Sequence, residues 1–220
     1  MRTIDMQTWP RRRHFALYKD FANPHFNLCA SVDIAAFRAL LKERALSFSV
    51  ATVYLLARVA NEIPEFRYRI RGAEVVVHEV VHPSTTVLTA GDLFSFCTIR
   101  YNDDFPTFAA RATEMIARVR ANPTLEDEPG RDDLLFMTGI PWVSFTGLQH
   151  PIRLGHVDSV PRIAWGKFAP AGERLQMPLS VQAHHALMDG IHVGRYFSRV
   201  QEYLDQPHRL LSLGPLAPAD

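Results

Sequence analysis

The chain has 220 residues, 47% of them hydrophobic, and a formal net charge of +1. This length and composition predict one folded domain spanning residues 1–220 and exclude a disordered chain. The near-neutral charge provides no general attraction to nucleic acid or anionic membranes. The first residues lack the apolar segment of a secretory signal, and no apolar run is long enough to cross a bilayer, so we expect a cytoplasmic protein.

The first part of the chain is expected to form two helices and then two hairpins. Residues 32–46 carry apolar side chains at helical spacing, with Asp33 as the capping residue. Residues 49–63 are apolar nearly all round, which is typical of a buried helix. The pattern then changes to alternating and β-branched runs around turn residues at 71–72 and 91–92, which predicts two pairs of strands.

The middle of the chain predicts a further helix, a loop and more strands. An aspartate cap and a proline in the first turn open a helix over residues 103–123, and an acidic loop follows at 124–133. Residues 134–145 and 162–183 have the composition of strands, with a turn at 170–172 inside the second segment.

The last helix is expected over residues 193–204, where apolar side chains keep helical spacing. We expect the proline-containing tail, residues 207–220, to be exposed or disordered. Together these elements predict an α/β (α+β) two-layer sandwich, in which helices cover a mixed β-sheet.

Residues 183–194, AHHALMDGIHVG, place three histidines and an aspartate around a glycine. The strand before them alternates apolar and polar residues. Continuing that alternation puts His185 on the apolar face and His184 on the other. A buried imidazole is neutral near pH 7 and can accept a proton, so His185 is a candidate general base.

Two other interpretations of this stretch compete with the base. Zinc could be held by one of the paired histidines with Asp189 and His192, but adjacent strand residues point to opposite faces and HExxH is absent, so we predict no metal site. The histidines could also be core residues that only satisfy hydrogen bonds. Asp189 in this apolar setting needs a cation, either Arg195 or one of residues 11–13, which favours a structural role.

Several segments together resemble the chloramphenicol acetyltransferase family of the classical trimeric type. Its signature HHxxxDG is matched at residues 184–190, although the acyltransferase core of the 2-oxo acid dehydrogenase complexes shares that pattern. The resemblance extends to WPRRRHF at 9–15, to residues 63–87 with their PEFR and VHP pieces, and to NDDFPTF and IPWVSFT. It covers roughly residues 9–204 and leaves no room for lipoyl or peripheral-subunit-binding domains.

This resemblance implies a homotrimeric acetyltransferase with active sites at subunit interfaces, acetyl-CoA as co-substrate and no permanently bound cofactor. His185 would be the general base that takes the proton from a hydroxyl of chloramphenicol while that oxygen attacks the thioester directly. Thr138 stands where the family has a serine and would donate to the oxyanion of the tetrahedral intermediate. Asp189 would form a structural ion pair with Arg11.

The resemblance also assigns the acceptor pocket. Tyr18, Phe26 and Phe94 match aromatic pocket positions, and Phe96 stands where the family has a small residue. Leu17 and Ala164 also depart from the family pattern. In the trimer, His185 would face Tyr18, Phe26 and Thr138 of the next chain.

On the coenzyme side, Lys167 is retained, whereas Ser47 and Ser49 replace a basic and an aromatic residue. The altered pockets keep two alternatives open: the same chemistry on another small hydroxyl compound, and a non-catalytic trimeric binding protein with this fold. The presence of both His185 and Asp189 argues against a loss of catalysis. His184 and His192 have no assigned task.

Overall fold

A seven-stranded mixed sheet forms the centre of the computed structural model, which describes residues 1–125, 130–152 and 157–212. Its strand order is β2-β10-β8-β7-β5-β6, and β9 pairs with β10. The strand β7 runs parallel to β5 and β8, while the remaining pairs are antiparallel. The strands are β2 (His25–Asp33), β5 (His82–Leu88), β6 (Phe94–Thr98), β7 (Leu134–Ile140), β8 (Arg162–Gly166), β9 (Ala169–Ala171) and β10 (Arg174–His184).

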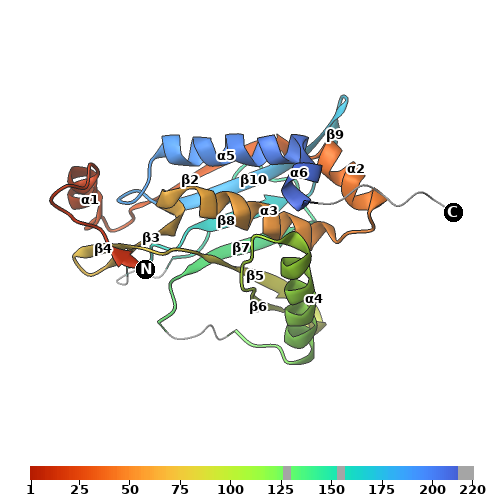
Figure 1. Ribbon diagram of the computed structural model, residues 1–220, viewed down its shortest axis with the longest axis horizontal. Coiled ribbons are helices and arrows are strands. Elements are labelled where there is room, and N and C mark those ends of the chain that lie inside the picture. Colours follow the sequence, from red (N-terminus) through yellow and green to blue (C-terminus); the bar gives the residue numbers. More distant parts are fainter. Residues whose placement is uncertain (126–129, 153–156, 213–220) are drawn as a thin grey trace.

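Helices cover one face of this sheet, so the predicted two-layer fold class is confirmed (Figure 1). None of the helices in the described residues has the length and apolar character that a membrane crossing requires. The helices are α1 (Arg12–Tyr18), α2 (Ala35–Glu43), α3 (Phe48–Glu62), α4 (Phe105–Ala121), α5 (Gly190–Asp205) and α6 (Pro207–Leu211), with short 3-10 turns η1 (Pro64–Arg67) and η2 (Ala90–Asp92).

Some helices begin beside short polar side chains that accept from free backbone N–H groups. The N-cap of α2 is Ile34 and not Asp33 as predicted, although Asp33 Oδ1 accepts from the Ala35 N–H at 3.0 Å. Asp104 Oδ2 accepts from the Thr107 N–H at 2.9 Å. Ser47 Oγ accepts from the Val50 N–H at 3.4 Å. These caps satisfy donors that the helices cannot pair internally. The predicted helices over 32–46, 49–63, 103–123 and 193–204 are all present within a few residues of their expected ends.

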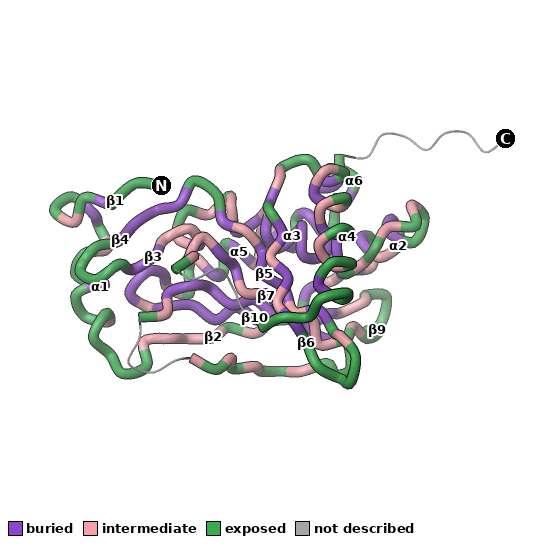
Figure 2. The backbone as a smooth tube through the Cα atoms, turned by 90° about the horizontal axis from the view of Figure 1, so that it is seen from below, coloured by how far each residue is buried: buried purple, intermediate pink, exposed green. Residues whose placement is uncertain are grey.

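The strand β2 is not predicted by its sequence. It pairs with β10 over nine residues, from Gln176↔Asp33 to His184↔His25. As an edge strand it is half-buried or exposed along most of its length, whereas β10 beside it is buried (Figure 2). A strand with one poorly covered face and one free edge lacks a strict apolar alternation, which is why its pattern is uninformative.

Two further strand predictions needed correction. The strand expected over 134–145 ends at Ile140, because Pro141 has no N–H to continue the ladder. The segment 162–183 contains three strands rather than two, and β9 and β10 turn at Gly172 with φ +62°. The hairpin turn at Gly72, with φ +61°, joins β3 (Tyr68–Arg71) to β4 (Glu74–Val77) as predicted.

The main core lies between the helices and the sheet. It includes Phe37, Leu41, Leu55, Phe108, Leu179, Val181, Val193 and Tyr196. The expectation of an exposed tail is wrong for α6, since Pro207 is buried and Leu210 and Leu211 belong to this core. Burial of their apolar side chains contributes more free energy than the conformational entropy that a short free terminus would keep. Residues 213–220 lie outside the described residues.

A second apolar cluster joins the amino terminus to the turn that follows β10. Trp9 and Phe15 pack with Ile70 and Val75, and with Ala186 and Leu187 of the turn. A small sheet, β1-β4-β3, with β1 at Arg2–Thr3, contributes the strand residues of this cluster. The amino-terminal segment is therefore fixed against the residues that carry the HHxxxDG motif.

Candidate active site

His185 is the first residue after the end of β10 and lies in the turn that leads into α5. Its backbone N–H donates to the Pro24 carbonyl at 2.8 Å, and the His184 carbonyl accepts from the Leu187 N–H at 3.0 Å. The His185 side chain contacts residues of α1 and β2. Its ring stacks on Tyr18 with centroids 4.2 Å apart and lies 4.7 Å from the ring of Phe26.

The expected burial of His185 on the apolar face is wrong. Its side chain is 33% exposed, whereas His184 is buried at 4%. The alternation used for the prediction ends with the strand, and His185 already belongs to the turn. Burial, followed by the charge of the nearby His25, lowers the pKa of His184 to about 4. The buried neutral histidine of the pair is thus His184.

Arg11 holds the turn through a fork of hydrogen bonds. Its two terminal nitrogens donate to the two carboxylate oxygens of Asp189, and the Nη2 bond to Oδ1 measures 2.5 Å. Nη2 also donates to the His185 carbonyl at 2.6 Å, and Nε donates to the Ala186 carbonyl at 3.1 Å. The cation beside Asp189 is therefore Arg11 and not Arg195. These hydrogen bonds lower the pKa of Asp189, so the carboxylate stays charged.

Asp189 also lies beside the catalytic candidate. Its Oδ1 atom is 3.2 Å from His185 Nδ1, although the pair lacks the alignment of a hydrogen bond. His192 acquires a structural task here: its Nδ1 accepts from the Asp189 N–H at 2.9 Å, at the start of α5. A nitrogen that accepts carries no proton, so the His192 proton is on Nε2, which lies 3.4 Å from Glu65 Oε1.

The zinc interpretation has no support in the geometry. No group of three or more histidine, cysteine, aspartate or glutamate side chains within residues 1–125, 130–152 and 157–212 is arranged to hold a metal ion. His184 accepts from the Ala186 N–H through Nδ1, and His192 is engaged at the helix start.

The remaining predicted residues are distributed over the sheet. Thr138 on β7 pairs with Ala164, which pairs with Ser180 of β10. Two strand spacings and five residues along β10 separate Thr138 from His185, which corresponds to about 19 Å within one chain. Phe94 and Phe96 pack against each other on β6, with centroids 5.7 Å apart, at the opposite sheet edge from β2.

Tyr18 and Phe26 require a correction. We expected them to face His185 from a neighbouring chain, but both contact it within the same chain. The cause is structural: β2 carries Phe26 alongside β10, and α1 is fixed over the turn by the cluster around Trp9. A single chain therefore unites His185, Tyr18 and Phe26, and leaves Thr138, Phe94 and Phe96 elsewhere.

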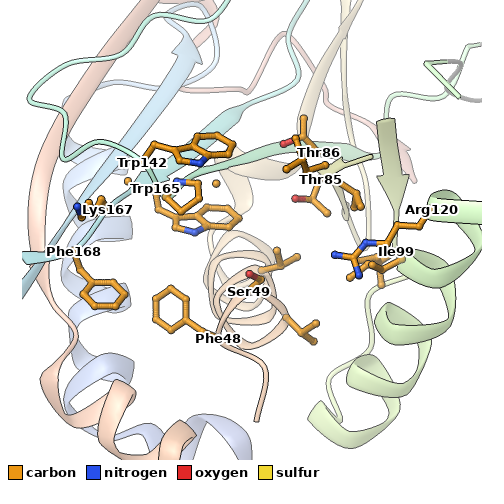
Figure 3. Close-up of a pocket in the computed structure, with 18 residues that line it drawn as sticks. Phe48, Ser49, Thr85, Thr86, Ile99, Arg120, Trp142, Trp165, Lys167 and Phe168 are labelled. Carbon is orange, nitrogen blue, oxygen red and sulfur yellow. The ribbon is translucent and has the colours of Figure 1, made fainter. Parts of the chain in front are cut away.

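A cavity of about 540 Å³ opens between the start of α3, α4, and the ends of β7 and β8 (Figure 3). Lys167 and Ser49, both expected on the coenzyme side, line it. The indole rings of Trp142 and Trp165 form one wall. Gly139 also faces the cavity, so by strand alternation Thr138 faces the other side of the sheet.

Two glycines shape this cavity by the lack of a side chain. A Cβ on Gly139 would lie 3.0 Å from ring atoms of Trp165. A Cβ on Gly166 would lie 2.8 Å from the Val143 carbonyl oxygen, next to the hydrogen bond by which the Lys167 N–H donates to that oxygen at 2.9 Å. The close approach at Gly166 sets the position of Lys167.

Comparison with known proteins agrees with this arrangement. The family model described as chloramphenicol acetyltransferase matches residues 1–201. A chloramphenicol acetyltransferase of Escherichia coli is 32% identical over 93% of this chain and 94% of its own length. One of Streptomyces acrimycini is 34% identical over 93% and 94% of the two chains. The chain belongs to the chloramphenicol acetyltransferase family.

Solved structures agree with the family assignment. A chloramphenicol acetyltransferase structure superposes with a TM-score of 0.83 and 26% identity, covering 92% of this chain and 99% of the other. A dihydrolipoamide acetyltransferase of Azotobacter vinelandii superposes with a TM-score of 0.68 and 21% identity, covering 90% and 88%. The second likeness shows only a shared fold.

Some features of this acetyltransferase-family site were not predicted. The cavity residues Trp142, Trp165 and Arg120 carried no signal of their own, because a tryptophan after a strand or an arginine at a helix end is usually structural. The capping bond of His192 could have been found, since it is the third residue of a helix whose cap is Asp189.

The buried histidines predict a pH dependence of stability. Burial lowers the pKa of His184 and of His150 to about 4 from an ordinary value of 6.5. As the pH falls below 6.5 the unfolded chain takes up these protons first, so stability is complete above 6.5 and is lost as the pH falls toward 4. Urea midpoints at one protein concentration should therefore drop between pH 7 and pH 5.

A variant pair tests the origin of this loss. His184→Asn keeps an acceptor for the Ala186 N–H and should show a smaller drop over the same pH interval. The exposed His14→Gln should behave as the wild type. An equal drop in all three proteins would contradict the assignment to His184.

Proposed function

We propose that this chain is an acetyl-CoA-dependent O-acetyltransferase whose acceptor is a hydroxyl group of chloramphenicol. One observation carries the proposal: the motif histidine His185 is held in a clamped turn, in a chain 32% to 34% identical to proteins named chloramphenicol acetyltransferase. The Arg11 fork fixes the backbone on which the base sits. Such fixed placement is what orientation of two reactants requires.

The environment of His185 supports its role as the base. A charged carboxylate oxygen 3.2 Å from Nδ1 favours the proton on that nitrogen, which leaves Nε2 free to accept one. Stacking on Tyr18 and packing against Phe26 restrict rotation of the ring. Asp189 thus supports the tautomer in addition to its bonds with Arg11.

The reaction that follows is direct transfer. His185 Nε2 takes the proton from the acceptor hydroxyl while that oxygen forms a bond to the thioester carbon of acetyl-CoA. The carbonyl oxygen becomes a tetrahedral oxyanion, to which Thr138 would donate from its hydroxyl. The carbon–sulfur bond then breaks, the oxyanion collapses to the ester, and the proton on His185 passes to the sulfur of free CoA.

The coenzyme is proposed to occupy the cavity beside Lys167, as a co-substrate and not as a resident group. Its walls combine the rings of Trp142, Trp165 and Phe168 with the cation of Lys167. Apolar walls suit the pantetheine arm, and a cation suits the phosphates.

The separation of Thr138 from His185 favours a site shared between chains. A distance of about 19 Å within one chain excludes joint action of the two side chains on one acetyl group. We therefore propose a homotrimer in which one chain supplies His185, Tyr18 and Phe26, and its neighbour supplies Thr138 with Phe94 and Phe96. The edge strand β2 suits such an interface, since the unpaired backbone N–H and C=O groups of an edge strand can pair with another chain.

Release of free thiol from acetyl-CoA tests the function. The wild-type protein should release thiol with chloramphenicol and yield acetylated product. Turnover only with another hydroxyl compound would refute the acceptor while keeping the chemistry. No turnover with any alcohol or amine would refute the enzyme and favour a binding protein. Sedimentation should show three chains per particle, and a stable active monomer would refute the shared site.

A further inference from the structure

The charges that line the cavity have one sign. Of the described lining residues, Arg120 and Lys167 are charged, and neither aspartate nor glutamate is among them. Arg120 reaches in from α4, and Lys167 lies on the opposite side (Figure 3). Two cations without a counter-charge in one cavity favour an anionic ligand.

Arg120 is available for such a ligand. Its side chain is exposed, and it makes no hydrogen bond or ion pair with any residue that the structure describes. A guanidinium presents several donors in a planar fork, which matches phosphate oxygens. This fork faces a cavity whose other walls are mostly apolar rings and aliphatic side chains.

The start of α3 adds to the positive potential. Phe48, Ser49 and Val50, from the first turn of this 15-residue helix, line the same cavity. A helix amino terminus attracts anions through its dipole and free N–H groups. Ser47 is uncharged and uses its side chain to cap the helix, accepting from the Val50 N–H. The side-chain charge in this cavity therefore comes from Arg120 and Lys167.

We propose that Arg120 binds a phosphate group of coenzyme A, and that with Lys167 it supplies the positive charge of the coenzyme cavity. This inference rests on the proposed dependence on acetyl-CoA. Arg120 acts in coenzyme binding and takes no part in proton transfer, since it lines the coenzyme cavity and the proposed base is His185. The residue thereby determines affinity for the coenzyme.

A purely structural explanation is that Arg120 stabilises the end of α4 through the helix dipole. Arg118 shares the last turn of α4 and has the same charge, but belongs to a different face of the helix from the cavity-lining residue. Arg118→Gln is therefore a matched control for Arg120→Gln. A helix-dipole effect would change CoA binding in both variants. A phosphate contact would change it only in Arg120→Gln.

Calorimetric titration with CoA and with 3′-dephospho-CoA tests the proposal. Arg120→Gln should raise the Kd for CoA about tenfold, and Arg118→Gln should leave it unchanged. If the variant binds only CoA more weakly, Arg120 contacts the 3′-phosphate. If it binds both ligands more weakly to the same extent, Arg120 contacts the pyrophosphate. In turnover, Arg120→Gln should raise the KM for acetyl-CoA and keep kcat.

An unchanged Kd in Arg120→Gln, or the same change in Arg118→Gln, would overturn the proposal. Circular dichroism should show that both variants are folded. The binding assay is independent of turnover. Arg120-sensitive CoA binding without transfer to chloramphenicol would refute the proposed acceptor and keep this inference. Normal transfer to chloramphenicol, with a CoA Kd that Arg120→Gln leaves unchanged, would refute this inference and keep the proposed acceptor.

Discussion

Replacement of His185 by alanine is expected to lower kcat for acetyl transfer at least a hundredfold. Removal of a general base costs typically 10²- to 10⁴-fold, and the ring of Tyr18 cannot replace the lost nitrogen. The CoA Kd should stay close to the wild-type value, because the cavity proposed to hold the coenzyme is lined by other residues, Lys167 among them, and not by His185. Thiol release under saturating substrates is the measurement.

The control for this variant is His192→Gln, the other accessible histidine of the motif region. Glutamine can still accept from the Asp189 N–H, so this variant should keep most of the activity. Retention of more than a tenth of the wild-type kcat in His185→Ala would contradict the proposed base. Equal urea midpoints for His185→Ala and the wild type would show that the variant loses activity because the base is absent and not because the protein unfolds.

Disruption of the Arg11–Asp189 pair is expected to have the second largest effect. Arg11→Ala leaves the Asp189 carboxylate without its cation and frees the carbonyls of His185 and Ala186. Loss of one partner from this part-buried, hydrogen-bonded pair costs about 2 kcal/mol of unfolding free energy. The turn that carries the base also loses its clamp, so activity should fall more than tenfold even where the protein is folded.

Arg11→Lys and a double variant sharpen this test. Lysine keeps the charge but lacks the fork that spans a carboxylate and two carbonyls, so it should recover only part of the stability. Arg11→Ala with Asp189→Ala should cost less than the sum of the single changes, because neither charge is left unpaired. The exposed Arg13→Ala is the matched control. Additive effects would contradict a direct pair.

Local patterns were sufficient for most of the helix layer. The apolar residues of α2, α3, α4 and α5, and the aspartate that caps α4, act within a few residues of one another, so their effect is visible in the sequence. Turn residues such as Gly72 identify a hairpin in the same local way. Elements that depend on a distant part of the chain were not predicted. The strand β2 forms because it pairs with β10, and α6 forms because its apolar residues pack into the core.

The sequence alone determined the family, the motif histidines and the need of Asp189 for a cation, since these depend on residue type and spacing. The tertiary structure decided which histidine is buried and that Tyr18 and Phe26 contact His185 within one chain, and it contains the Arg11–Asp189 pair that the resemblance implied. The physical reason is that burial and contact depend on where the strand ends and which segments pack over that end. Those facts follow from long-range packing and not from the order of residues around the motif.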